Sequence, residues 1–122
     1  MSFTIVKGED RTLNFQIKEV DENDVTTYLD LTDFSKIEMK VPATGGSYIS
    51  FTSTALEITV TDPKNGLFQV KMGDTKTALF KTGENQNIEV VIDINGAPPA
   101  GDRRIVQLYK AITVIAPFFT IT

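Results

Sequence analysis

Alternation of apolar and polar residues runs through most of this chain and constrains its fold more than any other feature. In residues 12–18, for example, Leu13, Phe15 and Ile17 are separated by polar side chains. Successive side chains of a β-strand point to opposite faces of its sheet, so this pattern predicts strands with one apolar and one polar face. Half-buried strands of this kind favour antiparallel pairing over a parallel sheet that is buried on both faces.

The same alternation recurs in segments that are separated by short turns. It is clear in residues 12–18, 36–41, 56–61, 68–72, 88–94 and 106–114. Shorter candidates are residues 3–6, 48–51 and 27–31, the last being a strand or an extended approach to one. Seven to nine short strands at this spacing are typical of a sandwich or barrel. The predicted core residues are Leu13, Phe15, Ile17, Ile37, Met39, Val41, Ile58, Val60, Phe68, Val70, Val90, Ile92 and Leu108.

Turn-forming residues lie between the expected strands. Asp62-Pro63-Lys64-Asn65-Gly66 predicts a hairpin, because proline presets its φ for a turn and Asn-Gly tolerates positive φ. Gly45-Gly46, residues 95–101 and the acidic residues 21–24 are predicted to form three further loops.

One short helical segment is predicted over residues 73–83. Asp74 is its expected N-cap and Gly83 its expected C-terminal stop. Leu79 and Phe80 would then pin the segment over one open end of the sandwich. Since the chain shows no internal repeat or linker composition, we expect a single β-sandwich domain over residues 1–122, with residues 116–122 as a C-terminal tail.

The composition argues against several classes of chemistry. The 122 residues include no Cys and no His, which leaves no thiolate zinc site, no cysteine nucleophile and no imidazole base or metal ligand. Phosphate-binding glycine motifs and the G-x-S-x-G motif are also missing. We therefore predict that the chain is not an enzyme, with no catalytic residues, no cofactor and no bound metal.

Charge and hydropathy also bear on the partners of the chain. A net charge of −4 argues against nucleic acid, because binding phosphates requires clustered Lys and Arg. Residues 1–8 lack the basic start of a signal peptide. The most apolar window, residues 111–119, is interrupted by Thr113 and Pro117 and is far shorter than the roughly 20 residues of a membrane-spanning helix. We expect no signal peptide and no membrane partner.

Two acidic groups have both a structural and a functional interpretation. Asp21-Glu22-Asn23-Asp24 is either a solvated loop tip or a weak cation site, although Val25 and Thr26 break the EF-hand pattern. The group Asp30, Asp33 and Glu38 is either a turn that binds its own backbone amides or a carboxylate pair for glycoside cleavage.

Five residues are candidates for contact with a partner. Arg103 and Arg104 either form ion pairs at the start of a strand or meet an anionic surface of a partner subunit. The last expected strand should end near Ile115, because Pro117 cannot donate to a sheet. Beyond it, Phe118, Phe119 and Ile121 either fold back on the core or dock on a neighbouring subunit by strand addition or groove insertion.

Three segments taken together resemble a known group of domains. Residues 4–15 contain a strand, the turn Gly8-Glu9-Asp10 and a second strand. Residues 29–41 place Asp30-Leu31-Thr32 before a strand, and residues 58–70 contain the Asp62–Gly66 hairpin, followed by Asp74-Thr75 and Gly83. This order is similar to the immunoglobulin-like β-sandwich domains of tailed-phage structural proteins, such as the N-terminal domain of upper baseplate proteins and related small tail or prophage proteins.

The resemblance implies an antiparallel immunoglobulin-like sandwich with one short helical turn. It also implies a virion protein of the tail, baseplate or capsid surface that is assembled in the bacterial cytoplasm. Its partners would be other virion proteins or copies of itself in a homo-oligomer. The alternative is a β-sandwich module that binds carbohydrate or a host surface, for which the 3 Tyr and 8 Phe are the available aromatic residues.

Overall fold

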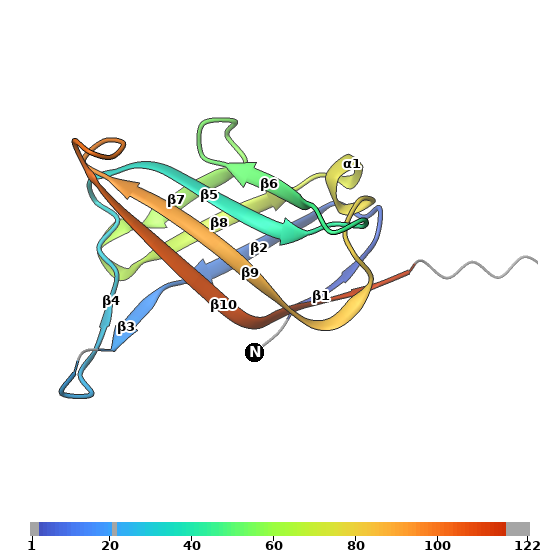
Figure 1. Cartoon of the computed structure of the whole chain (residues 1–122), viewed down its shortest axis with the longest axis horizontal. Helices are drawn as coiled ribbons and strands as arrows, with labels where there is room; N and C mark the ends of the chain where they lie inside the picture. Colours follow the sequence, from blue (N-terminus) through green and yellow to red (C-terminus); the bar gives the residue numbers. More distant parts are fainter. Residues whose placement is uncertain (1–2, 21, 117–122) are drawn as a thin grey trace, which may run out of the picture.

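A computed structural model describes residues 3–20 and 22–116, which form ten strands and two short helical turns (Figure 1). The strands are β1 (Phe3–Val6), β2 (Arg11–Gln16), β3 (Lys18–Val20), β4 (Thr26–Tyr28), β5 (Phe34–Pro42), β6 (Tyr48–Thr52), β7 (Ile58–Asp62), β8 (Leu67–Met72), β9 (Gly83–Ile94) and β10 (Asp102–Ile115). The helical turns are the 3-10 turn η1 (Pro63–Asn65) and α1 (Asp74–Thr77).

Two sheets pack face to face, as the alternation predicts. The larger sheet has the order β1-β10-β9-β5-β6 and the smaller one the order β2-β8-β7, while β3 and β4 form a separate hairpin. This arrangement is immunoglobulin-like: the last two long strands lie beside the β5–β6 hairpin in one sheet, and the second strand joins β8 and β7 in the other. Among the described residues, the paired strands are antiparallel except β1 and β10, which run parallel from Phe3↔Ile112 to Val6↔Ile115.

The segment predicted as one strand over residues 12–18 is divided at Ile17. The Ile17 amide donates to the Gly66 carbonyl at 3.0 Å, and the Ile17 carbonyl accepts from the Leu29 amide at 3.0 Å. These bonds turn the backbone away from β8, so β2 ends at Gln16 and β3 begins at Lys18. The division gives ten strands where the pattern indicates seven to nine.

The core lies between the apolar faces of the two sheets. All the predicted core residues are buried except Val60 and Leu108, which are partly buried and pack against the core. Phe15 stacks on Phe68 with 5.6 Å between ring centroids, and Phe3 meets Phe15 edge to face at 5.4 Å. Burying a side chain of this size stabilises the fold by about 1.5–3 kcal/mol.

The hairpin predicted at Asp62–Gly66 is present. Pro63–Asn65 form the 3-10 turn, and Gly66 closes it with a φ of +64°. Gly45-Gly46 lie between β5 and β6, and residues 95–101 connect β9 to β10. Residues 22–24 lie at the β3–β4 connection, whereas Asp21 falls outside the described residues.

The helical segment is shorter than predicted, and its caps differ. Gly73, not Asp74, is the N-cap of α1, and Gly83 begins β9 instead of stopping the helix. Tertiary contacts set these ends: Asp10 Oδ1 accepts from the Asp74 amide at 2.8 Å, and the Thr77 hydroxyl donates to the Glu9 carbonyl at 2.7 Å.

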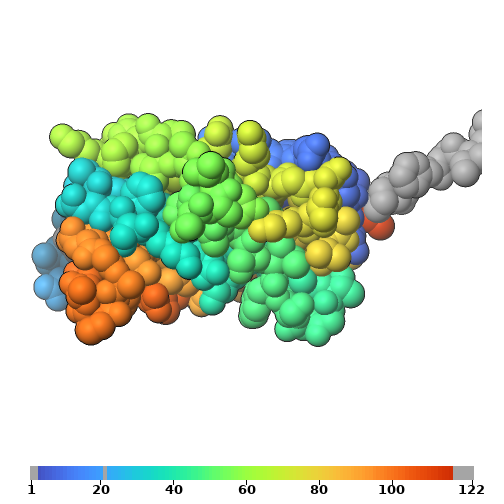
Figure 2. Space-filling model, turned by 90° about the horizontal axis from the view of Figure 1, so that it is seen from above, coloured from blue at the N-terminus to red at the C-terminus, as the bar shows by residue number. Residues whose placement is uncertain are grey.

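The two apolar residues that follow α1 have different surroundings. Phe80 is fully buried and meets Phe51 edge to face at 6.0 Å, whereas Leu79 is 52% exposed. Only Phe80 therefore pins this segment over the core, because the backbone directs adjacent side chains apart. Figure 2, which views the molecule from above, shows α1 (yellow) and the β6–β7 connection (green) on this side of the sandwich.

Candidate interaction surfaces

The outer face of the large sheet carries a regular grid of side chains. Because β5, β9 and β10 are neighbours, the strand register aligns their outward residues in three rows. The rows are Lys36, Asp93 and Arg103; Glu38, Val91 and Ile105; and Lys40, Glu89 and Gln107. The grid surrounds a shallow hollow of about 210 Å³.

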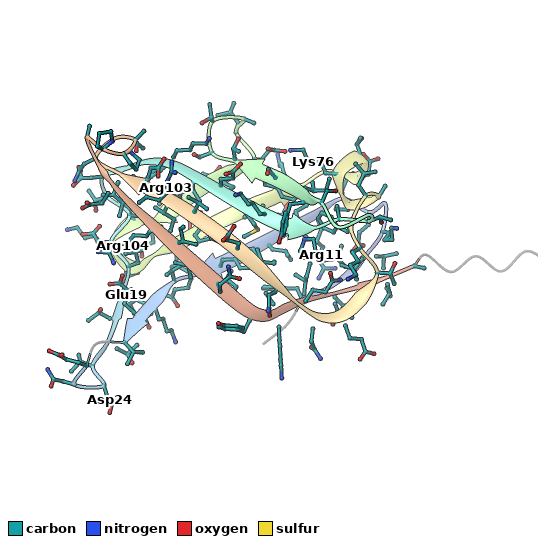
Figure 3. The ribbon with its side chains drawn as sticks, in the orientation of Figure 1. Arg11, Glu19, Asp24, Lys76, Arg103 and Arg104 are labelled. Atoms are coloured by element: carbon teal, nitrogen blue, oxygen red, sulfur yellow. The ribbon has the colours of Figure 1, made fainter. Side chains whose placement is uncertain are left out.

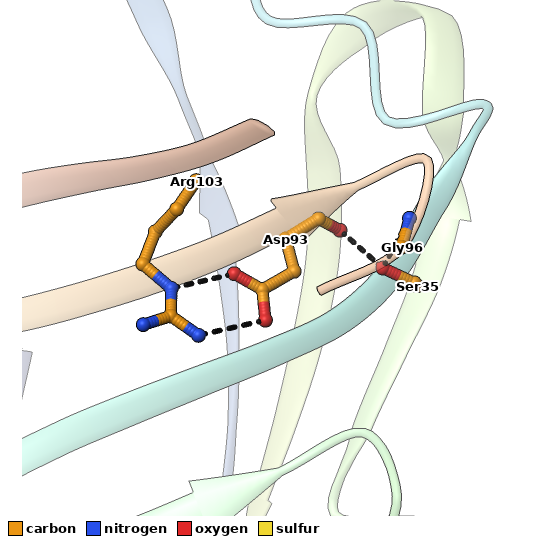
Figure 4. Close-up of polar contacts among 4 residues, drawn as sticks. All are labelled: Ser35, Asp93, Gly96 and Arg103. Carbon is orange, nitrogen blue, oxygen red and sulfur yellow. Dashed lines mark hydrogen bonds and ion pairs between the residues drawn. The ribbon is translucent and has the colours of Figure 1, made fainter. Parts of the chain in front are cut away.

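Arg103 and Asp93 form the strongest polar contact of this face. Arg103 Nε lies 2.7 Å from Asp93 Oδ1, and Arg103 Nη2 lies 3.1 Å from Asp93 Oδ2 (Figure 4). This two-pronged bond lowers the pKa of Asp93, although burial opposes the shift, and it raises the pKa of Arg103. Asp93 is only 4% exposed, so the ion pair belongs to the folded sheet.

The backbone of Asp93 is also anchored. Its carbonyl accepts a hydrogen bond from the Ser35 hydroxyl at 3.0 Å, and Ser35 Oγ in turn accepts from the Gly96 amide at 3.2 Å (Figure 4). These bonds attach β9 and the start of the β9–β10 connection to β5.

The charges of the outer face neutralise one another. The described residues around the hollow include three basic and three acidic side chains. Lys40 Nζ lies 3.7 Å from Glu89 Oε2, which adds a second cross-strand ion pair. Exposed ion pairs of this kind contribute little stability. The face therefore offers no net charge to a strongly charged partner.

Arg104 lies on the opposite face from Arg103, because adjacent residues of a strand alternate (Figure 3). Arg104 pairs in register with the buried Ile92, and its Nη1 reaches Glu19 Oε1 on β3 at 2.7 Å. The two arginines thus form no common patch. Each of them has an acidic partner within the chain, and neither partner is the neighbouring Asp102.

A groove opens between the two sheets on the side of β10 and β2. Of the described strands, β9 alone pairs in register with residues 105–108. On the other side of β10, β1 pairs only with Ile112–Ile115, and the Arg104–Glu19 ion pair lies beyond the other end of this stretch. We call residues 105–109 the open edge. The open groove, about 620 Å³, is lined by Phe3, Asn14, Phe15, Gln16, Lys18, Gln107, Leu108, Tyr109 and Ala111.

Both polar and apolar groups are accessible at this edge. Tyr109 is 76% exposed and Ile105 is 62% exposed. Phe15 is nearly buried at the base of the groove. An unpaired strand edge offers amide and carbonyl groups to another strand, and proteins usually block such edges. The sequence analysis does not predict this groove. The only sequence features that hint at it are the shortness of the strand predicted over residues 3–6 and the polar residues that follow Ile17.

A second hollow, of about 500 Å³, has a polar lining and lies near Tyr48. Its residues are Pro42, Tyr48, Lys81, Glu84, Asn85, Gln86, Asn87, Glu89 and Gln107. Tyr48 is 62% exposed. Several of the amides already have partners: Gln86 Nε2 donates to the Lys81 carbonyl at 2.6 Å, and Asn87 Oδ1 accepts from the Lys110 amide at 2.9 Å.

Asp30 takes the structural role that the sequence allows for it. Asp30 Oδ1 accepts from the Thr32 amide at 2.9 Å and from the Thr32 hydroxyl, which fixes the predicted bend and lowers the pKa of Asp30. Asp24 lies near the far end of the β3–β4 hairpin (Figure 3). Within residues 3–20 and 22–116, no group of three or more acidic side chains is arranged to hold a metal ion.

The remaining predicted contact residues, Phe118, Phe119 and Ile121, lie outside the described residues. No helix in the described part of the chain is both long and apolar enough to cross a membrane. Comparison with protein-family models and with curated proteins finds no match for the chain.

Proposed function

We propose that this chain is a non-enzymatic structural or assembly protein of a phage or prophage virion, located in the tail, baseplate or capsid surface and assembled in the host cytoplasm. It works through contacts with other virion proteins or with copies of itself. The resemblance of its turn and strand motifs to tailed-phage domains supports this proposal, and the immunoglobulin-like sandwich is the fold that the resemblance implies.

The observation that carries the proposal is the open edge of β10. Residues 105–109 lie between β1 and β3 without a pairing strand on that side among the described residues. The edge has exposed apolar side chains at Ile105 and Tyr109. A strand edge left open beside an apolar groove is suited to binding another polypeptide by strand addition.

The proposal is tested on virus particles. Tailed particles are purified from a host that carries the coding sequence, and their proteins are measured by quantitative mass spectrometry. The chain should be present in a fixed ratio to the major tail protein, and its deletion should yield incomplete or unstable particles. Intact, infectious particles that lack the chain in the wild type would refute the proposal.

A carbohydrate- or host-surface-binding module is the second candidate, and the hollow near Tyr48 favours it. An exposed aromatic ring beside amide side chains is a chemistry that suits a sugar. The test is binding to an array of bacterial surface glycans, comparing Tyr48→Ala with Tyr109→Ala. Specific binding that only Tyr48→Ala abolishes would support this candidate.

A further inference from the structure

We infer that Asn95 is a site of spontaneous covalent modification, at which the side chain loses ammonia and the backbone isomerises. The sequence contains two Asn-Gly pairs, Asn95-Gly96 in the β9–β10 connection and Asn65-Gly66 at the end of η1. The packing of the fold protects the second pair and leaves the first one reactive. The reaction needs only these residues and water, so the inference stands apart from the proposed function.

The chemistry of an Asn-Gly pair is an attack of one amide on another. The glycine nitrogen bonds to Cγ of the asparagine, and Nδ2 leaves as ammonia, taking the proton that the attacking nitrogen gives up. The product is a five-membered succinimide ring. Water opens this ring at the side-chain carbonyl to give aspartate, or at the backbone carbonyl to give isoaspartate, in which the main chain runs through Cβ and Cγ. Glycine favours the attack because it has no Cβ beside its nitrogen.

Hydrogen bonds hold both residues of the protected pair. Asn65 Nδ2 donates to Asp62 Oδ2 at 2.9 Å, and the Asn65 carbonyl accepts from Gln16 Nε2 at 3.0 Å. The Gly66 amide, which would be the attacking group, donates to the Pro63 carbonyl at 3.3 Å. The leaving group, the intervening carbonyl and the attacking nitrogen are therefore all engaged.

The space around the two glycines differs as well. Ring closure requires the peptide unit between asparagine and glycine to rotate, so it needs room on the glycine side. Gly66 is buried, and a Cβ added to it would lie 2.8 Å from the Ile17 carbonyl oxygen. Gly96 is half-buried, and a Cβ added to it would meet nothing within 4 Å. Asn65 can therefore react only after its turn opens locally.

Asn95 has the freedom that ring closure requires. It is exposed in the β9–β10 connection, which lies at one end of the sandwich (Figure 1). Its backbone amide donates to the Asp33 carbonyl at 2.9 Å, which anchors the residue on its N-terminal side. Its side chain makes no hydrogen bond to residues 3–20 or 22–116, so Cγ can turn toward the Gly96 nitrogen.

One hydrogen bond restrains the attacking nitrogen. The Gly96 amide donates to Ser35 Oγ at 3.2 Å, and the Ser35 hydroxyl donates to the Asp93 carbonyl at 3.0 Å (Figure 4). The nitrogen has to give up this bond before it can attack Asn95. Ser35 is therefore a positioning residue that sets how often the nitrogen is available.

Isoaspartate at residue 95 would not fit the folded backbone. It adds one carbon to the main chain at a point where Gly101 packs closely, since a Cβ on Gly101 would collide with the carbonyl oxygens of Gly96 and Ile94. These are backbone atoms of the same connection, so the added length has to displace them. The bond from residue 95 to the Asp33 carbonyl would be lost with them. The modification should therefore loosen this end of the sandwich.

The test follows the purified chain during incubation at mildly alkaline pH, with peptide mapping by mass spectrometry. Deamidation raises the mass of a peptide by about one dalton, and reversed-phase chromatography separates its aspartyl and isoaspartyl forms. In the folded chain, Asn95 should be modified about tenfold or more faster than Asn65, because Asn65 requires local opening. In concentrated urea, where neither pair is packed, the two rates should be similar. Equal rates in the folded chain, a faster reaction at Asn65, or an Asn95 that stays intact while the unfolded chain reacts would overturn the inference.

The restraint by Ser35 is tested with a matched pair of variants. Ser35→Ala should raise the rate at Asn95 and leave the rate at Asn65 unchanged. The control is Ser53→Ala, because Ser53 Oγ likewise accepts from a backbone amide, that of Ile37, at 2.9 Å. The control should leave the rate at Asn95 as in the wild type. An unchanged or lower rate in Ser35→Ala, or an equal rise in both variants, would overturn the role of Ser35.

The structural consequence is measured on the isolated isoaspartyl form. Its melting temperature should be several degrees below that of Asn95→Asp, which carries the same added charge without the added backbone carbon. Equal melting temperatures would show that the connection accommodates the longer backbone, and would overturn the loosening of this end of the sandwich.

Discussion

Replacing Gly66 with alanine should destabilise the fold more than a glycine substitution at a turn ordinarily does. Gly66 has a φ of +64°, a region that costs an alanine about 1–2 kcal/mol. A Cβ at this position would also lie 2.8 Å from the Ile17 carbonyl oxygen and 2.9 Å from the Leu29 carbonyl oxygen. Both are backbone atoms, and Ile17 is itself bonded to Gly66 and Leu29, so neither can yield without disturbing the base of the β3–β4 hairpin.

Two other glycines separate the contributions of conformation and contact. Gly46 has a φ of +82° with nothing within 4 Å of an added Cβ, so Gly46→Ala should show the conformational cost alone. Gly73 has neither constraint, and Gly73→Ala should be close to neutral. The expected loss in the free energy of unfolding is therefore near zero for Gly73→Ala, about 1–2 kcal/mol for Gly46→Ala, and about 3 kcal/mol or more for Gly66→Ala.

The assay is equilibrium unfolding in urea, with a thermal melt as a check. A loss of about 1 kcal/mol lowers the melting temperature of a domain of this size by roughly 3–5 °C. If Gly66→Ala is no more destabilising than Gly46→Ala, the close packing of Ile17 and Leu29 around Gly66 is wrong.

Three further predictions concern the core, the α1 turn and the response to acid. Ile92→Ala should lower the free energy of unfolding in urea by about 2–5 kcal/mol, because the fully buried side chain leaves a cavity; a loss below 1 kcal/mol would contradict its place in the core. Thr77→Val should cost about 1–3 kcal/mol, because the Glu9 carbonyl loses a buried donor, and a neutral result in the same assay would exclude that bond. The lowered pKa of Asp93 means that the ion pair with Arg103 stabilises the fold above about pH 4, the unfolded value, and that this contribution is lost as the pH falls through the lower folded value. Urea unfolding across this range should therefore show a smaller acid-induced loss for Arg103→Gln than for the wild type, and equal losses would refute the pairing.

The local sequence pattern was enough to predict those structural features that depend only on neighbouring residues. Alternation identified most of the strands, because a strand places successive side chains on opposite faces whatever it pairs with. The Asp62–Gly66 hairpin followed in the same way, since proline and glycine act on their own backbone angles. The bend at Asp30 is equally local, with its partner Thr32 two residues away.

Features that join distant segments were decided by the tertiary structure. Ile17 alternates perfectly with its neighbours, and only its bonds to Gly66 and Leu29 end the strand there. The start of α1 is set by Asp10, which lies 64 residues earlier in the chain. No local rule predicts these partners, because the energy of such a bond depends on how the sheets pack.

In the candidate surfaces, too, some features follow from the sequence and others were decided by the tertiary structure. The sequence alone indicated that Arg103 and Arg104 begin a strand, and alternation alone implies that they face opposite ways. Their partners, Asp93 and Glu19, were decided by strand register and by the position of the β3–β4 hairpin. The open edge has a similar origin: β1 is too short to cover all of β10, and its place beside Ile112–Ile115 was determined by the packing of the two sheets. The groove beside the open edge exists only because two strand edges meet in the folded chain.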